Sequence, residues 1–357
     1  MTSRSQTPGA IAAARLAQTT AHLTGLSSAG SPIGATSRIS YNSASSSSGG
    51  ALKVEFREIK NITCFGAGLM GKLFYAVPSP QLIMAQRLNY LEQVTLCDVT
   101  PQALENGLKI IKSSLGRVAK KAYPDSTEQQ KSFVDSVVST INTTTDAKEA
   151  VKQADLVVEA IVENLEVKRK LFSSLDTHAP EHCIFATNTS SLSVTEIADS
   201  TSEGRRATFG GLHFFNPVPQ MKLVEVIRTS NTSDATNAAL IDVCKRMQKT
   251  SVSCKDTPGF IVNRLLVPYM LEAVRMLERG DASAEDIDTA MKLGAGYPMG
   301  PIQLTDFVGL DTCQHIMTGW REKGALSPEL VESIKALEEK VKEGKLGRKT
   351  GEGFFKY

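Results

Sequence analysis

Between residues 57 and 250, short runs of β-forming residues alternate with stretches whose apolar residues recur at helical spacing. Six of these runs are strand candidates, at residues 62–65, 94–97, 156–161, 183–186, 208–213 and 223–228. Alternation of this kind is typical of βαβ units, in which crossover helices make neighbouring strands run parallel. We therefore predict an α/β fold with a Rossmann-like, mostly parallel sheet over residues 57–253.

The chain changes character after Cys254, where helical patterns take over. An apolar pattern runs through residues 260–279, and we expect Pro268 to interrupt it. Ser283, followed three residues later by Asp286, is typical of a helix start. Residues 294–301 read as a loop. The sequence thus predicts a smaller, all-helical C-terminal domain over residues 254–357.

The first fifty residues differ from all that follows. Ala, Ser, Thr and Gly dominate, the charges are those of Arg4, Arg15 and Arg38, and no acidic residue precedes Glu55. This is the composition of a mitochondrial transit peptide. A disordered tail without a targeting role is the alternative. We expect residues 1–52 to be a transit peptide or disordered.

Composition argues against several other classes of protein. The formal net charge is +2, and removing the three arginines of the N-terminal segment leaves about −1, which does not indicate nucleic-acid binding. No apolar run approaches the roughly 20 residues of a membrane-spanning helix, so we expect no membrane insertion. The 6 cysteines form no Cys-x-x-Cys pair or metal-ligand cluster. We expect free thiols and no bound metal.

A Gly-x-Gly-x-x-Gly string directly follows the first predicted strand. Glycines in this context permit a tight turn and let backbone N–H groups approach a pyrophosphate. Asp98 follows the second strand, where a carboxylate accepts hydrogen bonds from ribose hydroxyls and repels a 2′-phosphate. NAD is therefore favoured over NADP. The predicted cofactor residues are Gly66, Gly68, Leu69, Met70, Gly71 and Asp98.

The spacing of this fingerprint is unusual. Asp98 lies 27 positions after Gly71, whereas about 20 are expected. Pro78 and Pro80 fall where the pyrophosphate-facing helix should begin, so that helix cannot run unbroken.

The string HFFNPVPQMKLVEV carries the strongest chemical signal. His213 ends one predicted strand and Glu225 lies on the next, and Pro217 and Pro219 force the segment between them to turn. This spacing allows the two side chains to meet. An imidazole can take the proton of a secondary alcohol while hydride leaves for a nicotinamide, and a carboxylate can orient it. Taken alone, a strand-end histidine is more often an ordinary hydrogen-bonded residue, and Glu225 a solvated one.

Several longer strings are distinctive. They are GAGLMG, DLVVEAIVENLEVK, ATNTSSL, GLHFFNPVPQMKLVEV, DTPGFIVNRLLVPY, GAGYPMGP and KTGEGFFKY. Through them, residues 60–357 closely resemble the short-chain L-3-hydroxyacyl-CoA dehydrogenase family. The resemblance implies NAD-dependent, reversible oxidation of L-3-hydroxyacyl-CoA to 3-ketoacyl-CoA, as in fatty-acid β-oxidation in the mitochondrial matrix. It also implies a homodimer formed through the helical domain.

The resemblance assigns roles to individual residues. It implies that His213, paired with Glu225, is the catalytic base. Ser190 and Asn263 are implied to be polar groups around the substrate carbonyl or hydroxyl, and Asn216 to support the site. Ser190 and Asn216 are also expected to contact the cofactor.

The resemblance places further residues at the cofactor and at CoA. Glu163, Lys168 and Arg348 are implied to contact the cofactor, although a surface ion pair is the alternative for the first two. Ser114 and Lys121 lie two turns apart on a predicted basic helix and are implied to contact CoA. A solvated basic face is the alternative there.

The main departure from the family pattern is KLFYAVPSPQLI, which follows Gly71 where the family continues into a small-residue helix. It is either a tolerated surface loop or the product of a misread exon boundary. Because of this segment, an inactive homologue whose NAD binding is disrupted by residues 72–83 stays open. A dehydrogenase of hydroxy acids that lack CoA is a separate alternative, against which the basic helix argues.

Overall fold

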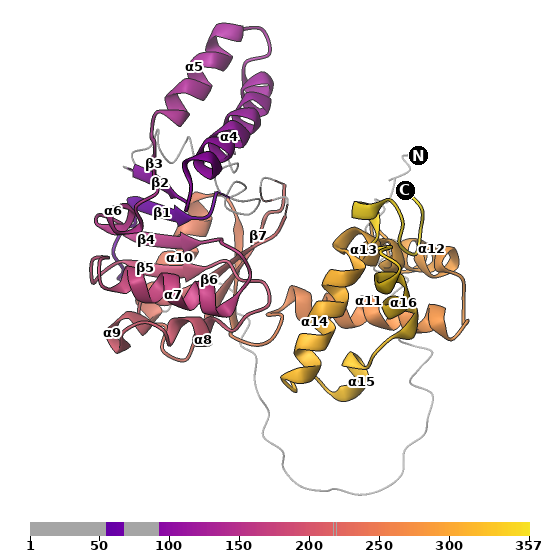
Figure 1. The fold of residues 1–357 in the computed structure, drawn as a ribbon. Coiled ribbons are helices and arrows are strands. Elements are labelled where there is room, and N and C mark those ends of the chain that lie inside the picture. Colours follow the sequence, from indigo (N-terminus) through magenta and orange to yellow (C-terminus); the bar gives the residue numbers. More distant parts are fainter. Residues whose placement is uncertain (1–54, 68–92, 217, 219) are drawn as a thin grey trace, which may run out of the picture. The chain divides into compact units, whose positions relative to one another are not determined.

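A computed structural model describes residues 55–67, 93–216, 218 and 220–357 of the chain (Figure 1). The predicted transit segment 1–52 lies outside the described residues. So do Gly68, Leu69, Met70 and Gly71 of the fingerprint, and the unusual segment 72–83.

One eight-stranded sheet has the order β3-β2-β1-β4-β5-β6-β7-β8. Its strands are β1 Asn61–Phe65, β2 Gln93–Cys97, β3 Ile141–Thr144, β4 Leu156–Glu159, β5 Ile184–Thr187, β6 Phe209–Phe214, β7 Leu223–Arg228 and β8 Thr250–Lys255. All neighbouring strands run parallel except β6 and β7, which are antiparallel. The order reverses between β1 and β4, as in Rossmann folds, and the predicted fold class is confirmed.

Two strands are missing from the prediction. The side chains of β3 and β8 are exposed or only partly buried, so neither strand shows the apolar run or clean alternation that marks a strand along the sequence. The six predicted strands all form, with ends that differ by at most two residues. Strand β4 ends at Glu159, earlier than the predicted 161.

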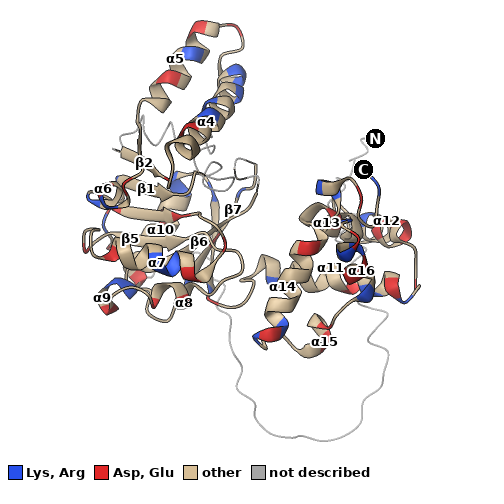
Figure 2. Ribbon diagram, in the orientation of Figure 1, with Lys and Arg blue, Asp and Glu red and all other residues tan. Residues whose placement is uncertain are grey.

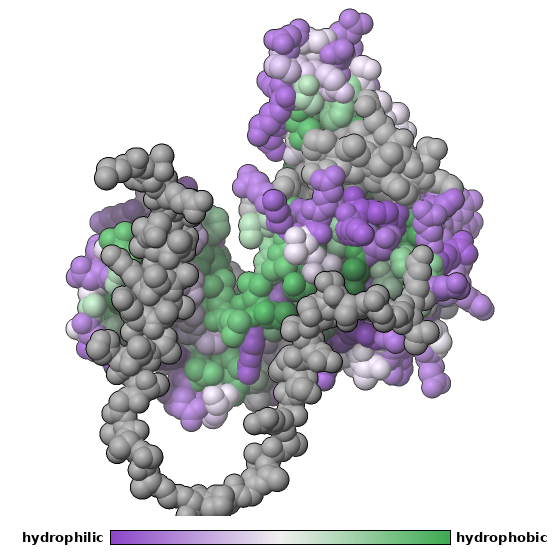
Figure 3. Space-filling view, turned by 180° about the vertical axis from the view of Figure 1, so that it is seen from behind, coloured by the Kyte–Doolittle hydropathy of each residue, from purple (hydrophilic) through white to green (hydrophobic). Residues whose placement is uncertain are grey.

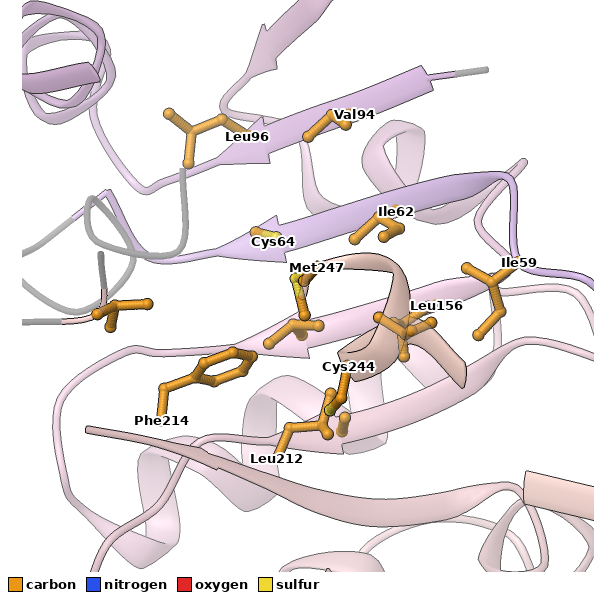
Figure 4. Close-up of a cluster of buried hydrophobic side chains, with 14 of the residues drawn as sticks. Ile59, Ile62, Cys64, Val94, Leu96, Leu156, Leu212, Phe214, Cys244 and Met247 are labelled. Carbon is orange, nitrogen blue, oxygen red and sulfur yellow. The ribbon is translucent and has the colours of Figure 1, made fainter. Parts of the chain in front are cut away.

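Helices cover both faces of the sheet. On one face α4 (Pro101–Ala122) and α10 (Asp234–Arg246) pack on the strands, and Figure 4 shows Cys244 and Met247 over the strand residues Cys64 and Leu156. On the other face lie α6 (Ala147–Val151), α7 (Leu165–Asp176) and α8 (Val194–Ala198). Burial on both faces explains why every residue of β4 before Glu159 is apolar. The short α9 spans Glu203–Arg206.

Helix α4 begins at Pro101, where the side chain of Thr100 caps it, and it packs against α5 (Thr127–Val138). Its buried stripe contains Leu104, Ile111 and Leu115, which recur along the sequence at helical spacing. Its exposed positions include Lys109, Lys112, Lys120 and Lys121, and Figure 2 colours the lysine and arginine positions of the helix blue. In the space-filling view, the far ends of α4 and α5 are mostly hydrophilic (Figure 3).

The C-terminal part is all-helical, as predicted. Its helices are α11 Val262–Glu278, α12 Ala284–Gly294, α13 Pro301–Val308, α14 Leu310–Glu322, α15 Pro328–Val331, α16 Lys335–Lys342 and the 3-10 helix η1 Arg348–Thr350. Ser283 caps α12 by accepting a hydrogen bond from the amide of Asp286. The expected interruption at Pro268 is wrong, because Pro268 lies inside α11. Buried contacts of Val267 and Leu271 hold the helix together across the missing donor.

Candidate active site

The centre of the site is a histidine–carboxylate pair on two antiparallel strands. The register of β6 and β7 places His213 directly opposite Glu225. Nδ1 of His213 lies 2.7 Å from Oε2 of Glu225. The His213 side chain is 5% exposed and that of Glu225 is 0% exposed. The structure therefore brings together the two residues that the sequence placed on neighbouring strands.

The second carboxylate oxygen of Glu225 meets the start of a helix. Oε1 accepts hydrogen bonds from the amides of Ile261 at 3.0 Å and Val262 at 2.9 Å, where α11 begins. Burial alone would raise the pKa of Glu225, but hydrogen bonds from His213 and these amides bring it below its ordinary value. The ionised carboxylate of Glu225 accepts a hydrogen bond from Nδ1–H of His213, so Nε2 presents its lone pair.

Aromatic side chains enclose the histidine. The ring centroids of Phe215 and Phe260 lie 4.5 Å and 5.5 Å from that of His213. Phe260 and Gly259 both have positive φ, 53° and 79°. A side chain on Gly259 would also meet the Trp320 ring at 2.6 Å. This tight loop delivers the α11 amides to Glu225, and the string DTPGFIVNR carries its signal in the sequence.

Two polar residues from separate elements meet beside this pair. The side-chain amide of Asn263 donates a hydrogen bond to the carbonyl of Ser190 over 3.3 Å. Ser190 is exposed and Asn263 half-buried. Asn188, which the prediction omitted, accepts a hydrogen bond from the Phe214 amide at 2.8 Å and so joins the ends of β5 and β6.

Asn216 is exposed and lies in the loop that joins β6 to β7. Lys249 fixes this loop, because its ammonium donates hydrogen bonds to the carbonyls of Val218 and Met221. The prediction missed Lys249, which lies far from the loop in sequence. A lysine just before a strand carries no signal that would have identified it.

The first fingerprint glycine lies where the strand order reverses. Gly66 has φ of 103°, and a Cβ there would lie 2.6 Å from the carbonyl oxygen of Ala160, so only glycine fits. The carboxylate of Asp98 accepts hydrogen bonds from the amides of Ala67 at 2.5 Å and Val99 at 2.7 Å. A glycine turn with a carboxylate at the end of β2 fits a dinucleotide with a free ribose diol.

Glu163 and Lys168 pair at the protein surface, where the lysine side chain is buried while Glu163 is exposed. The Lys168 ammonium lies 3.1 Å from Oε2 of Glu163 and 2.6 Å from Oε1 of Glu159, and the lysine side chain is 1% exposed. Burial alone would raise the pKa of Glu163, but the Lys168 charge and hydrogen bonds from Thr189 and Ser190 lower it. Glu159 was missed, although a carboxylate ending an apolar strand is a visible signal.

The residues expected at CoA lie on α4. Ser114 is buried on this helix and Lys121 is exposed near its C-terminal end. Arg117, which the prediction omitted, donates a hydrogen bond from Nη2 to Oγ of Ser114 at 2.8 Å. Arg348 lies exposed in η1, with its guanidinium 5.9 Å from the centroid of the Phe307 ring.

Comparison with known proteins identifies the two halves of the chain. Residues 61–257 match the family model described as 3-hydroxyacyl-CoA dehydrogenase, NAD binding domain, and residues 259–357 match that of the 3-hydroxyacyl-CoA dehydrogenase, C-terminal domain. The chain belongs to the 3-hydroxyacyl-CoA dehydrogenase family. It is therefore an oxidoreductase with an NAD-binding domain, as predicted. The boundary placed between residues 253 and 254 stays a prediction.

Relatives of this 3-hydroxyacyl-CoA dehydrogenase are similar over nearly their whole lengths. The human mitochondrial hydroxyacyl-coenzyme A dehydrogenase is 52% identical over 318 residues, which are 89% of this chain and 96% of the relative. A probable 3-hydroxyacyl-CoA dehydrogenase of Caenorhabditis elegans is 51% identical over 85% of this chain and 94% of its own. The crystal structure of (S)-3-hydroxybutyryl-CoA dehydrogenase from Ralstonia eutropha superimposes with a TM-score of 0.74, at 37% identity, over 84% of this chain and 99% of that one.

Proposed function

We propose that this 3-hydroxyacyl-CoA dehydrogenase oxidises L-3-hydroxyacyl-CoA to 3-ketoacyl-CoA with His213 as general base. The observation that carries the proposal is the buried 2.7 Å pair of His213 and Glu225. NAD, when bound, supplies the acceptor for the hydride. The ionised Glu225 keeps the proton on Nδ1, so that Nε2 accepts the hydroxyl proton of the substrate.

Glu225 also stabilises the imidazolium that forms, because its negative charge lies at hydrogen-bond distance in a buried site. In the reverse reaction the imidazolium returns the proton from Nε2. Ser190 and Asn263 are polar groups beside this pair and suit the substrate oxygen. Phe215 and Phe260 keep water away from the imidazole.

On the cofactor side, Gly66 allows close approach of the backbone and Asp98 accepts hydrogen bonds from the ribose diol. Glu163 and Lys168 lie after β4, beyond the carboxyl end of the sheet, where ligands of such folds bind. Asn216 and Arg348 complete the proposed cofactor residues. The diol-facing carboxylate favours NAD over NADP, because it would repel a 2′-phosphate.

On the substrate side, α4 offers CoA a basic surface (Figure 2). Lys121 is exposed on this helix, and Ser114 lies two turns before it beside the guanidinium of Arg117. Cationic groups on one helix face suit the phosphates of CoA. This surface distinguishes an acyl-CoA enzyme from a dehydrogenase of free hydroxy acids.

We propose a mitochondrial matrix location and a role in β-oxidation, because similar proteins are named mitochondrial and the N-terminal segment carries only arginine charges and no acids. We also propose a homodimer. An apolar groove on α11 and α12, lined by Tyr269, Ala273, Met276, Ile287 and Met291, suits a second copy of the helical domain. The mass in solution tests it, since a monomer would contradict the dimer.

The first experiment follows NADH oxidation with acetoacetyl-CoA in the parent and in His213→Gln. Turnover in the parent and near-loss in the variant, with NADH still bound, are the expected results. Inhibition by free CoA separates this function from that of a dehydrogenase without a CoA site. A folded parent that binds no NADH would instead indicate an inactive homologue.

A further inference from the structure

A fully buried carboxylate, Glu159, lies at the end of β4 outside the proposed proton-transfer pair. Its side chain is 0% exposed and receives three hydrogen bonds. Oε1 accepts from the Lys168 ammonium at 2.6 Å and the Ile161 amide at 2.7 Å, and Oε2 accepts from the Thr187 hydroxyl at 2.7 Å. Both oxygens are therefore held, and Glu159 cannot turn toward a ligand without losing these bonds.

Glu159 is one of two carboxylates that pair with the side chain of Lys168. A buried ammonium is costly unless it is paired, and Lys168 is nearer to Glu159, at 2.6 Å, than to Glu163, at 3.1 Å. Glu159 thereby draws Lys168 toward β4. Without Glu159, the Lys168 ammonium would pair with Glu163 alone. We then expect the side chains of Lys168 and Glu163 to shift together.

Glu163 in turn organises the loop that follows β5. Its Oε1 accepts hydrogen bonds from the Thr189 hydroxyl at 2.7 Å and from the amides of Ser190 at 2.8 Å and Ser191 at 3.1 Å. The carbonyl of Ser190 meets the side chain of Asn263. A continuous set of short contacts therefore runs from Glu159 through Lys168 to the residues proposed to face cofactor and substrate.

We propose that Glu159 is a positioning residue for the cofactor side of the site, which fixes Lys168 and Glu163 and through them the loop of residues 189–191. This inference rests on the proposed function for the identity of the ligand, but the loop geometry is independent of it. Thr187 supports the same carboxylate, since its hydroxyl is the donor to Oε2.

A second buried ion pair in the same domain provides a matched control. Asp176 and Arg205 lie 2.8 Å apart with side chains 11% and 5% exposed. Asp176 ends α7, whereas Lys168 lies in its first turn, so the two pairs occupy opposite ends of one helix. We expect loss of either ion pair to destabilise the domain. Only loss of the Glu159–Lys168 pair should change the loop of residues 189–191.

The test compares Glu159→Gln with Asp176→Asn in the full chain. Glutamine keeps the shape and can still bond Thr187, but it removes the charge. We expect kcat/KM to fall about 10- to 100-fold, the scale of a misplaced binding group. The Kd for NADH should rise, and hydrogen exchange of residues 187–192 should quicken. In Asp176→Asn we expect a lower Tm, faster exchange near residues 202–205, and parental kinetics below that Tm.

Parental exchange at 187–192 and parental kcat/KM in folded Glu159→Gln would overturn the proposal, and so would equal effects in Asp176→Asn. If Glu159→Gln does not fold, Glu159→Asp decides, because it keeps the charge but withdraws the carboxylate from Lys168: we expect smaller changes in the same readouts, and no change contradicts the role. A parent that fails to bind NADH refutes the proposed function, while the exchange of 187–192 still decides the role of Glu159.

Discussion

Glu225 holds the imidazole of His213 with one carboxylate oxygen and the first amides of α11 with the other. The carboxylate thereby connects the proposed base to the first helix of the C-terminal domain. Amides at a helix start favour negative charge, which keeps Glu225 ionised while it is buried.

Replacing Glu225 with Gln should lower kcat by about 100- to 10,000-fold, because the amide keeps the shape but loses the charge that stabilises the imidazolium. NADH affinity should stay near the parental value. Steady-state kinetics and a fluorescence titration measure the two effects. Glu196→Gln, a change in an exposed carboxylate, is the control. A kcat within twofold of the parent in Glu225→Gln would refute the orienting role.

Acid should remove the stabilising contribution of Glu225. Its pKa is lower in the folded protein than the ordinary value of about 4.3 in the unfolded chain, so the contribution is complete above that value. It disappears as the pH falls through the folded pKa. The difference in free energy of unfolding between the parent and Glu225→Gln should therefore shrink as the pH falls below about 4.3. Urea unfolding across this range measures it, and a difference that grows with acid contradicts the assignment.

Asp98→Asn should weaken NADH binding by about tenfold and reduce discrimination against NADPH, because we propose that the carboxylate accepts hydrogen bonds from the ribose diol and repels a 2′-phosphate. Titration with each nucleotide gives the ratio of the two Kd values. Asp125→Asn, in the turn between α4 and α5, should leave both values unchanged. An unaltered ratio in Asp98→Asn would show that Asp98 acts only on the Ala67 turn.

Gly259→Ala should destabilise the protein by more than about 2 kcal/mol, since it combines a positive φ with a clash. A Cβ there would lie 2.6 Å from the Trp320 ring and 2.8 Å from the Arg264 amide. Gly280 has nearly the same φ, 73°, with nothing within 4 Å, so Gly280→Ala isolates the backbone cost at about 1 kcal/mol. Denaturant unfolding of both variants separates the two effects. Equal losses would mean that the loop moves aside without cost.

Lys121→Ala should raise KM for acetoacetyl-CoA a few-fold and make it less sensitive to salt, because an exposed ammonium contributes screened attraction of about 1 kcal/mol or less. The value of kcat should be unaffected. Lys335→Ala, on α16, removes an equal charge from the helical domain and should change neither quantity. Equal KM changes in the two variants would place CoA elsewhere.

Much of this architecture could be predicted because it depends on local patterns. Apolar runs bounded by turns predict six strands, and the spacing of Leu104, Ile111 and Leu115 predicts α4. Strands β3 and β8 were not predicted, because they lie at the two edges of the sheet and their exposed side chains need not be apolar. The continuity of α11 through Pro268 was not predicted, because tertiary packing outweighs the loss of one backbone hydrogen-bond donor.

The candidate site was likewise predictable only in part. Residue type and order along the chain are enough to nominate His213, Glu225 and the glycine fingerprint, since turns and strand ends leave local signals. The 2.7 Å meeting of His213 with Glu225 depends on the antiparallel register of β6 and β7, and the enclosure of Lys168 depends on the end of β4. These contacts join residues that are far apart in the sequence. Their attraction is strong only where burial has excluded water, and which residues are buried together is decided by the tertiary structure.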